Sequence, residues 1–594
     1  MGTIDSTLIS DELVDFLLYD VLDVTALCAL PAFADHARDT FDPWLGTCRK
    51  LARELLFPAY RAMDAEPPEL VDGHVKVHPR MRAIWGELVA TGLVACARPV
   101  EVGGQSLPMT VAAFANAYLM AGNLSAFCYA GLTTGAAHLI EAFGDEQLKA
   151  TFMRPMYEGR YTGTMALTEP HAGSSLADIT TRATPTESGH YLIRGSKIFI
   201  SGGDHDIAEN VVHLVLARIE GAPLGSKGIS LFAVPRERLE AEKLVPNDVH
   251  VTGLIHKIGW RGLPSLALSF GEADDCRGWL VGAPNQGLRC MFQMMNEARI
   301  MVGTNAAATA SVAYQESLRY ALDRRQGRAV TAPDPAGPQV PLVDHADVRR
   351  MLLRQKAIVE GSLCLIGTTA RYADLAEHDA DPQAKQRAKL ICDLLTPIAK
   401  TFPAEKGYEV NVLAVQIHGG YGYSSEYLPE ALLRDQKLNS IHEGTTGIQS
   451  LDLLGRKVVA GGGAAFAALR DDVMSDIERA LESGVDASII DPLRAAFDRM
   501  AELTMTLGGR GLQGDVDGML SHANDYLDAL ATVVIGWMWL KMASAVAARD
   551  DDFAKGLRQA ALYWARTELP RVSVLAALCD SAERSYLDLD PAWL

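Results

Sequence analysis

The most informative stretch of this chain runs from Val415 to Gln449 and reads VQIHGGYGYSSEYLPEALLRDQKLNSIHEGTTGIQ. It carries a glycine pair after a helical pattern and ends with a Glu-Gly-Thr triplet that begins at Glu443. A glutamate in a loop is by itself most often a solvated charge. The stretch therefore becomes informative only together with other parts of the chain.

Two earlier segments also combine glycine, hydroxyl and aromatic residues. Met165–Ile179 reads MALTEPHAGSSLADI, and Gly195–Gly203 reads GSKIFISGG. Glycine lets a backbone approach a ligand closely, and backbone N–H groups and hydroxyls can bind phosphate and ring oxygens. Taken alone, the first could be a tight turn between a helix and a strand, and the aromatic residue of the second could be simple core.

The hydrophobic periodicity divides the chain into helical and β regions. Residues 11–159 repeat apolar positions at three- and four-residue steps, which predicts helices. From Tyr161 to Val281, short β-branched or alternating runs are separated by Gly, Pro and Asn, which predicts strands. A long helical pattern resumes at Gly287, and the glycine-rich segment Val458–Phe466 predicts a flexible linker before a last helical region.

Composition excludes some classes of protein. The 594 residues are too many for one core, and 55 basic against 74 acidic residues give a net charge of -19, which argues against nucleic acid as a partner. The nine cysteines are dispersed without a C-x-x-C pair, which indicates free thiols and no zinc site. The first residues lack the pattern of a signal peptide, so we expect a cytoplasmic protein.

Two patterns invite a wrong reading. Residues 530–548 are apolar enough for a membrane span, but Lys541 and Gly536 interrupt them, which favours a buried bundle helix. Gly509, Gly511 and Gly514 spell the dinucleotide-binding G-x-G-x-x-G motif, but a helix end precedes them where that motif needs a strand. We therefore interpret these glycines as helix-end and turn residues.

In their order around a β block, the three segments resemble the acyl-CoA dehydrogenase family. The length and the C-terminal helical region resemble its subgroup with an added C-terminal domain, which includes the 3-methylmercaptopropionyl-CoA dehydrogenases. The resemblance implies an α+β, mainly α, fold with a middle β-barrel and a C-terminal four-helix bundle. The implied divisions are an N-terminal extension (1–40), a helical domain (41–160), the β domain (161–282), the bundle (283–457) and the added helical domain (466–594).

The resemblance also implies a site for FAD and an acyl-CoA thioester. Glu443 matches the catalytic base. The matched cofactor-binding positions are Met165, Leu167, Thr168, Gly173, Ser174, Phe199, Ile200, Ser201, Arg324, Gln416, Gly419, Gly420 and Thr445. The matched substrate-binding positions are Ser174, Asn296, Arg299 and Gly444, although Arg299 could also only pair with a neighbouring acid. No metal site is implied.

This chain departs from the family pattern at several of these positions. Phe199 and Ser201 stand where Trp and Thr are usual, which keeps an aromatic ring and a hydroxyl. RQGR follows Arg324 where a Phe-Gly pair is common, which leaves the nearby adenine contacts in doubt. Gly447 stands where a glutamine often contacts ribose, so that contact is not carried over.

The implied reaction removes an α-proton and a β-hydride from the thioester. Glu443 takes the proton in a dry pocket that raises its pKa, while the β-carbon gives its hydride to flavin N5. The Glu443 N–H group and a ribityl hydroxyl stabilise the enolate charge. The position where some relatives carry the base is Ala298, and its neighbour Glu297 points about 100° away on a helix.

The resemblance further implies electron-transferring flavoprotein as acceptor, a homodimer or dimer of dimers, and a place in fatty acid β-oxidation. By resemblance, Arg324, Gln416, Gly419 and Gly420 serve the FAD of a neighbouring subunit. Two alternatives stay open: an acyl-CoA oxidase that passes electrons to oxygen, and a non-catalytic relative that acts as a scaffold. The acyl group is not fixed by any motif.

Overall fold

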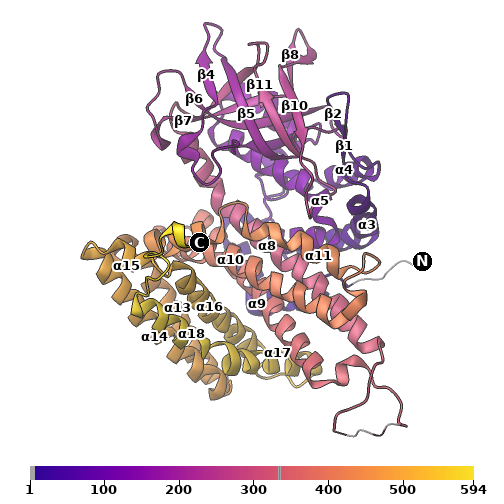
Figure 1. The fold of residues 1–594 in the computed structure, drawn as a ribbon, viewed down its shortest axis with the longest axis vertical. Helices are drawn as coiled ribbons and strands as arrows, with labels where there is room; N and C mark the ends of the chain where they lie inside the picture. The colour runs from indigo at the N-terminus through magenta and orange to yellow at the C-terminus, as the bar shows by residue number, and fades with distance from the viewer. Residues whose placement is uncertain (1–6, 332–333, 335) are drawn as a thin grey trace. The chain divides into compact units, whose positions relative to one another are not determined.

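The computed structural model describes residues 7–331, 334 and 336–594, without the side chains of residues 292–295. The chain forms two compact units (Figure 1). Unit 1 contains residues 43–107 and 118–298, and unit 2 contains residues 7–42, 108–117 and 299–594. Long helices therefore contribute to both units.

A closed β-barrel forms the centre of unit 1. Each barrel strand is hydrogen-bonded to the next around a ring. In ring order the strands are β5 (Tyr191–Ser201), β12 (Arg277–Val281), β7 (Ile229–Pro235), β6 (Asn210–Ile219) and β4 (Arg182–Pro185). Strands β11 (Ser265–Phe270) and β10 (Val249–Leu254) extend the sheet beyond β5, and β3 (Tyr161–Ala166) pairs with β6 in parallel. This confirms the predicted β-barrel.

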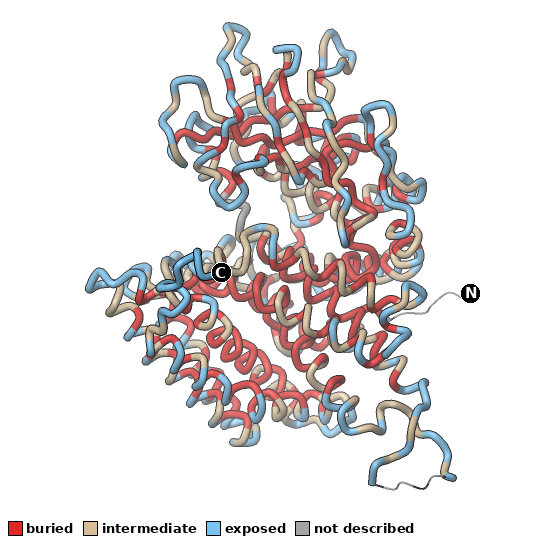
Figure 2. The backbone as a smooth tube through the Cα atoms, in the orientation of Figure 1, coloured by how far each residue is buried: buried red, intermediate tan, exposed pale blue. Residues whose placement is uncertain are grey.

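The barrel interior is filled by alternating apolar side chains. In β6 and β7, Val215, Ala217, Phe232 and Val234 are fully buried, and Ile200 of β5 joins the same core. Figure 2 shows buried stretches in both the barrel and the helices. The period of two that predicts the strands is therefore the period that fills the barrel.

Helices precede the barrel, with one exception. Unit 1 includes α3 (Phe57–Ala65), α4 (Arg80–Ala90) and most of α5 (Met109–Phe143). The prediction of helices throughout residues 11–159 is wrong for β1 (Glu69–Val71) and β2 (His74–Lys76), which pair as a hairpin. Strands of three residues are too short to show a period of two.

Unit 2 is built mainly of helices, with one isolated β-bridge between Arg325 and Pro341 among its described residues. Its first set of helices is the last part of α8 (Gly287–Asp323), α9 (Ala346–His378), α10 (Pro382–His418), α11 (Pro429–Gln436) and α12 (Thr446–Asp452). Its second set is α13 (Ala464–Glu482), α14 (Ala487–Leu512), α15 (Val516–Leu520), α16 (Ala523–Ala545), α17 (Asp552–Tyr563) and α18 (Arg571–Ser581). The start of α8 at Gly287 agrees with the predicted boundary. Gly514 follows α14 with a φ of +88°, as expected for a turn glycine and not for a dinucleotide motif.

The second set of helices packs on the first within the same compact unit. The indole N–H of Trp539, on α16, donates to the Ala357 carbonyl of α9 at 3.1 Å. The Lys406 ammonium of α10 lies 2.8 Å from an Asp528 carboxylate oxygen of α16. Gly361 lets the two helices meet closely, because a Cβ there would lie 2.9 Å from Ile535. The helices after the glycine-rich segment therefore share a core with α9 and α10.

Helix α16 is the apolar helix predicted from residues 530–548. It and α5 are long and apolar enough to cross a membrane, but 83% and 89% of their most apolar windows are buried inside the fold. Lys541 is accommodated by Asp476 of α13, whose carboxylate lies 3.1 Å from its ammonium. The same carboxylate accepts the indole N–H of Trp537 at 2.6 Å. The predicted buried bundle helix is thus observed.

We expect Asp476→Ala to lower the free energy of unfolding by about 3 kcal/mol, because it leaves Lys541 and the buried Trp537 N–H without their shared acceptor. Denaturant titration of the purified protein measures the change. Asp471→Ala is the matched control, since Asp471 is an exposed carboxylate on the same helix. Equal losses in the two variants would contradict a role of the buried acceptor.

Candidate active site

The turn at Glu443 and Gly444 has an unusual backbone. Glu443 has a φ of +53° and Gly444 a φ of +88°. A left-handed conformation costs a residue with a Cβ about 1–2 kcal/mol. Two buried side chains hold this turn: the Gln449 amide donates to the Glu443 carbonyl at 2.9 Å, and the Lys400 ammonium donates to the Gly444 carbonyl at 2.8 Å. Strain that is held in this way is typical of functional sites.

The charge of the Glu443 side chain is tuned by its surroundings. Desolvation raises the pKa of its carboxyl, while Arg299 and Lys400 act in the opposite direction. The residue is nevertheless exposed to solvent, so the fully enclosed carboxylate expected from the sequence is not observed. The structure thus places Glu443 on an accessible turn, where Arg299 and Lys400 act on its carboxyl.

The residues beside Glu443 have defined structural roles. The Thr445 hydroxyl caps α12 by accepting the Ile448 N–H at 3.3 Å, and it keeps its own proton for another partner. Burial lowers the pKa of His442 to about 4, so this ring is neutral at pH 7. A neutral ring adds no charge next to the carboxylate.

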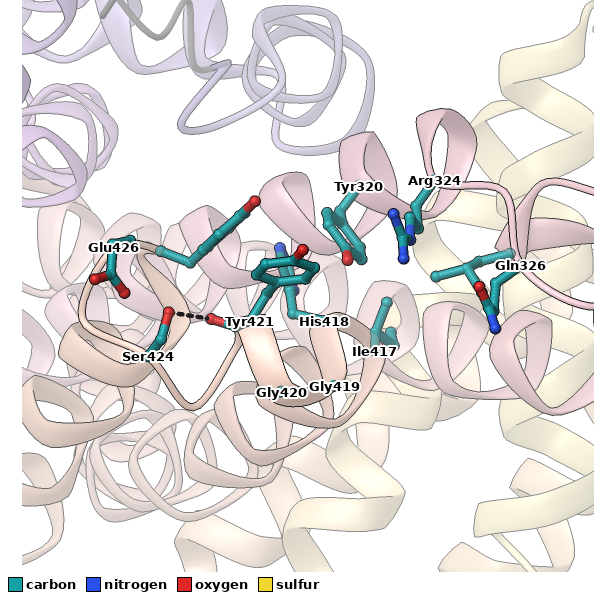
Figure 3. A pocket seen from close by; sticks show the side chains of 12 residues that line it. Tyr320, Arg324, Gln326, Ile417, His418, Gly419, Gly420, Tyr421, Ser424 and Glu426 are labelled. Atoms are coloured by element: carbon teal, nitrogen blue, oxygen red, sulfur yellow. Dashed lines mark hydrogen bonds between the residues drawn. The ribbon is translucent and has the colours of Figure 1, made fainter.

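A pocket of about 700 Å³ lies in unit 2 at the end of α10 (Figure 3). Its walls include Arg324, Gly419 and Gly420, three of the predicted cofactor-binding residues. Gln416 is exposed on the last turn of α10, but it does not line the pocket. The structure therefore brings together residues that are separated by almost a hundred positions in the chain.

The lining of this pocket combines glycine backbone with aromatic and charged side chains. Gly419 adopts a φ of +62° and a ψ of -137°, a conformation nearly restricted to glycine, and a Cβ on either glycine would enter open space. The rings of Tyr320 and His418 stack at 4.3 Å, and the Arg324 guanidinium lies 5.8 Å from the Tyr421 ring centre. The lining thus combines aromatic faces, one cation and bare backbone with one acid, Glu426.

In unit 1, the loop after β3 is fastened to β5 by a buried ion pair. The Glu169 carboxylate lies 2.9 Å from the Lys197 ammonium, and both side chains are almost completely buried. The same carboxylate accepts N–H and O–H groups of Thr180 and Thr181 at 2.6–3.0 Å. Lys197 also donates to the Leu167 carbonyl at 3.0 Å. These contacts fasten the loop to β5.

The charges of this pair are stable at neutral pH. Although burial raises the pKa of Glu169, the Lys197 charge and hydrogen bonds from Thr181 and Thr180 lower it to about 2. Burial lowers the pKa of Lys197 to about 8, and Glu169 limits that decrease. Both groups are therefore ionised at pH 7.

The predicted flavin-edge residues lie around this pair. The Thr168 carbonyl accepts the Ile198 N–H at 2.9 Å, which ties the loop to the strand that carries Phe199. Phe199 has a φ of +61° and is 60% exposed, so its ring is presented at the surface of unit 1. The Ile200 side chain belongs to the barrel core, which leaves only its backbone for a ligand. Met165, Leu167 and Ser201 are partly buried, and Gly173 and Ser174 are exposed.

Two predicted substrate-binding residues lie on α8. Arg299 is buried and forms an ion pair with Asp452 at 2.6 Å. This agrees with the alternative that Arg299 only pairs with a neighbouring acid. Asn296 is partly buried on the same helix. Glu297, beside the alternative base position, lies 3.2 Å from His138, which lowers its pKa against the opposing effect of burial.

Three residues that support the site were not predicted from the sequence. Lys197, Lys400 and Gln449 bind backbone carbonyls or a carboxylate beside predicted residues. The lysines carry a signal in retrospect: Lys400 is the one charge in the run TPIAKTFPA, residues 396–404. A lone cation in an apolar run indicates either a buried functional charge or a long side chain that reaches solvent.

Family models match most of the chain. The N-terminal, middle and C-terminal domains of acyl-CoA dehydrogenase match residues 45–160, 164–273 and 285–458. A fourth model, described as acetyl-CoA dehydrogenase C-terminal like, matches residues 469–590. The added helices of unit 2 therefore have a family model of their own.

Similar proteins support the same assignment. The chain is 35% identical to 3-methylmercaptopropionyl-CoA dehydrogenase of Ruegeria pomeroyi, with 89% of each chain covered. It is 32% identical to the broad-specificity linear acyl-CoA dehydrogenase FadE5 of Mycobacterium tuberculosis, with 97% of this chain and 98% of that protein covered. The crystal structure of an acyl-CoA dehydrogenase complexed with FAD from Bacillus anthracis shares the fold, with a TM-score of 0.74, 19% identity, and 94% of this chain and 91% of that chain covered. This chain belongs to the acyl-CoA dehydrogenase family.

Proposed function

We propose that this protein is a FAD-dependent acyl-CoA dehydrogenase that converts an acyl-CoA thioester to the trans-2-enoyl-CoA, with Glu443 as the base. The observation that carries the proposal is the strained Glu443–Gly444 turn, which presents an accessible carboxyl with a raised pKa. When bound, FAD supplies the two-electron acceptor for the β-hydride.

The protein's own groups bind, orient and take the proton. The Glu443 carboxylate accepts the α-proton, and the Glu443 N–H group donates to the thioester oxygen as enolate charge develops. Phe199 and Ser201 offer a ring and a hydroxyl to the flavin, and Gly173 and Ser174 offer an open backbone and hydroxyl. Asn296, Arg299 and Gly444 are proposed on the substrate side, where Arg299 acts through its pair with Asp452.

The pocket of unit 2 would hold the ADP part of FAD. The family resemblance assigns this contact to a neighbouring subunit, so we propose that the protein is a homodimer or a dimer of dimers. The proposed acceptor of the electrons is an electron-transferring flavoprotein, in fatty acid β-oxidation. Nine free cysteines support a reducing compartment, the cytoplasm.

The reaction and the acyl group can be tested together. A panel of acyl-CoA thioesters, including 3-methylmercaptopropionyl-CoA and linear fatty acyl-CoAs, should bleach the flavin absorbance near 450 nm (roughly where oxidised flavins absorb). Hydrogen peroxide formed in proportion to turnover would instead identify an oxidase. No bleaching by any thioester would favour the non-catalytic alternative.

We expect Arg324→Ala to weaken FAD binding by about 10–100-fold, because it removes a charge-assisted contact to the pyrophosphate. Reconstitution of the apoprotein, followed by flavin fluorescence, measures the dissociation constant. Arg325→Ala is the matched control, since this exposed neighbour donates to the Gln339 carbonyl instead of lining the pocket. If both variants bound FAD as the parent does, the pocket would not be a cofactor site.

A further inference from the structure

Lys400 is a fully buried cation next to the proposed base. It lies on α10, and its ammonium donates a 2.8 Å hydrogen bond to the Gly444 carbonyl. Transferring an ammonium ion from water to a protein interior is strongly unfavourable unless other groups compensate for it. An apolar residue of similar length would fill the same space without this penalty, so the charge itself needs an explanation.

Three charged groups act on Lys400. Burial lowers the pKa of its ammonium to about 8, Glu405 and Glu443 act to raise it, and Arg299 acts to lower it. Arg299 is itself paired with Asp452 at 2.6 Å, which reduces its competing charge. With a pKa of about 8, Lys400 is mostly protonated at pH 7. It therefore places a positive charge at the Gly444 carbonyl of the Glu443–Gly444 turn.

The other groups around the turn do not replace this charge. His442 is neutral at pH 7, since burial lowers its pKa and Lys400 acts in the same direction. Gln449 holds the Glu443 carbonyl at 2.9 Å with a neutral amide. Gln449 and Lys400 thus both hold the turn by hydrogen bonds to its two carbonyls. Only Lys400 and the paired Arg299 also lower the pKa of the Glu443 carboxyl by their charges.

We propose that Lys400 is a positioning residue for the dehydrogenation: its buried ammonium ion holds the Glu443–Gly444 turn through the Gly444 carbonyl and favours the ionised, proton-accepting form of Glu443. This inference rests on the proposed role of Glu443 as base. A merely structural lysine would stabilise the fold without affecting the protonation of that carboxyl.

The test is the pH dependence of flavin bleaching by a good acyl-CoA substrate. The acid limb of kcat/KM reports the pKa of the base in the free enzyme. In Lys400→Met, loss of the positive charge should move that limb upward by about one pH unit. Lys400→Arg, which keeps the charge, should retain the limb of the parent enzyme.

Two further variants separate the possible outcomes. Lys400→Gln keeps a hydrogen-bond donor without charge and should move the limb like Lys400→Met, which also covers the case in which the methionine variant fails to fold. Lys541→Met removes a lysine from the C-terminal helices and should leave the limb unchanged. An unmoved limb in the neutral Lys400 variants would overturn the inference. Failure of the proposed function is distinguishable, because it would appear as unchanged bleaching in Glu443→Gln.

Discussion

Glu443→Gln is expected to reduce the rate of flavin bleaching by acyl-CoA about 10³-fold or more while the protein still binds FAD. The substitution keeps the size of the side chain and removes the group that accepts the α-proton, and general bases typically contribute 10²–10⁴-fold. Rapid-mixing absorbance near 450 nm, roughly the flavin band, measures the rate, and the flavin-to-protein ratio of the purified variant measures cofactor content.

Glu297→Gln is the informative control for this experiment. Glu297 is the acid closest to the alternative base position in the sequence, and its carboxylate contacts His138. We expect this variant to keep most of the bleaching rate. The reverse result, with loss in Glu297→Gln and retention in Glu443→Gln, would transfer the base to α8 and exclude the Glu443 turn.

Glu169→Ala is expected to lower the free energy of unfolding of unit 1 by about 3–5 kcal/mol, because it leaves the buried Lys197 ammonium without its carboxylate. The donors of Thr180 and Thr181 lose their acceptor in the same variant. We also expect FAD to dissociate at a lower temperature, since the loop that carries Thr168 is no longer fastened to β5. Thermal and denaturant unfolding with a flavin fluorescence readout measure both effects.

The stability that Glu169 contributes should also depend on pH. The pKa of Glu169 is lowered to about 2 in the folded protein, so its contribution is present at neutral pH and is lost as the pH falls from its usual titration range toward 2. Glu158→Ala is the matched control, because Glu158 pairs with Arg160 in an exposed ion pair that contributes about 0–1 kcal/mol. Similar losses of unfolding free energy in both variants would show that the buried Glu169–Lys197 pair contributes no more stability than an exposed ion pair.

Much of the fold could be predicted from the sequence because its periods are long and unambiguous. The longer strands between Tyr161 and Val281, such as β5 and β6, are long enough for alternation to be visible, and the start of α8 follows a clear change of period. The β1–β2 hairpin is too short for that signal. That the last helices share a core with α9 and α10 depends on contacts between distant residues, such as the hydrogen bond from Trp539 to the Ala357 carbonyl, which no local pattern encodes.

The candidate site was predictable only in part. Motifs point to Glu443, Arg324 and the glycine pair as candidates, because ligand chemistry restricts the residue types at such positions. The supporting Lys197 and Lys400 follow from burial in three dimensions, and a lysine in an apolar run could equally reach solvent. The accessible position of Glu443 and the left-handed backbone around it likewise depend on tertiary contacts.

The shared core of unit 2 has a consequence for biosynthesis. Helices α9 and α10 are synthesised well before α16, with α13 and α14 between them in the chain. The face around Ala357 and Gly361 is therefore uncovered until α16 has been made. The N-terminal segment also depends on a residue that is made much later. Its Leu8 carbonyl accepts a hydrogen bond from the Ser311 hydroxyl at 2.9 Å. During translation the apolar surface that α16 covers in the folded protein is therefore expected to stay exposed until α16 has been made.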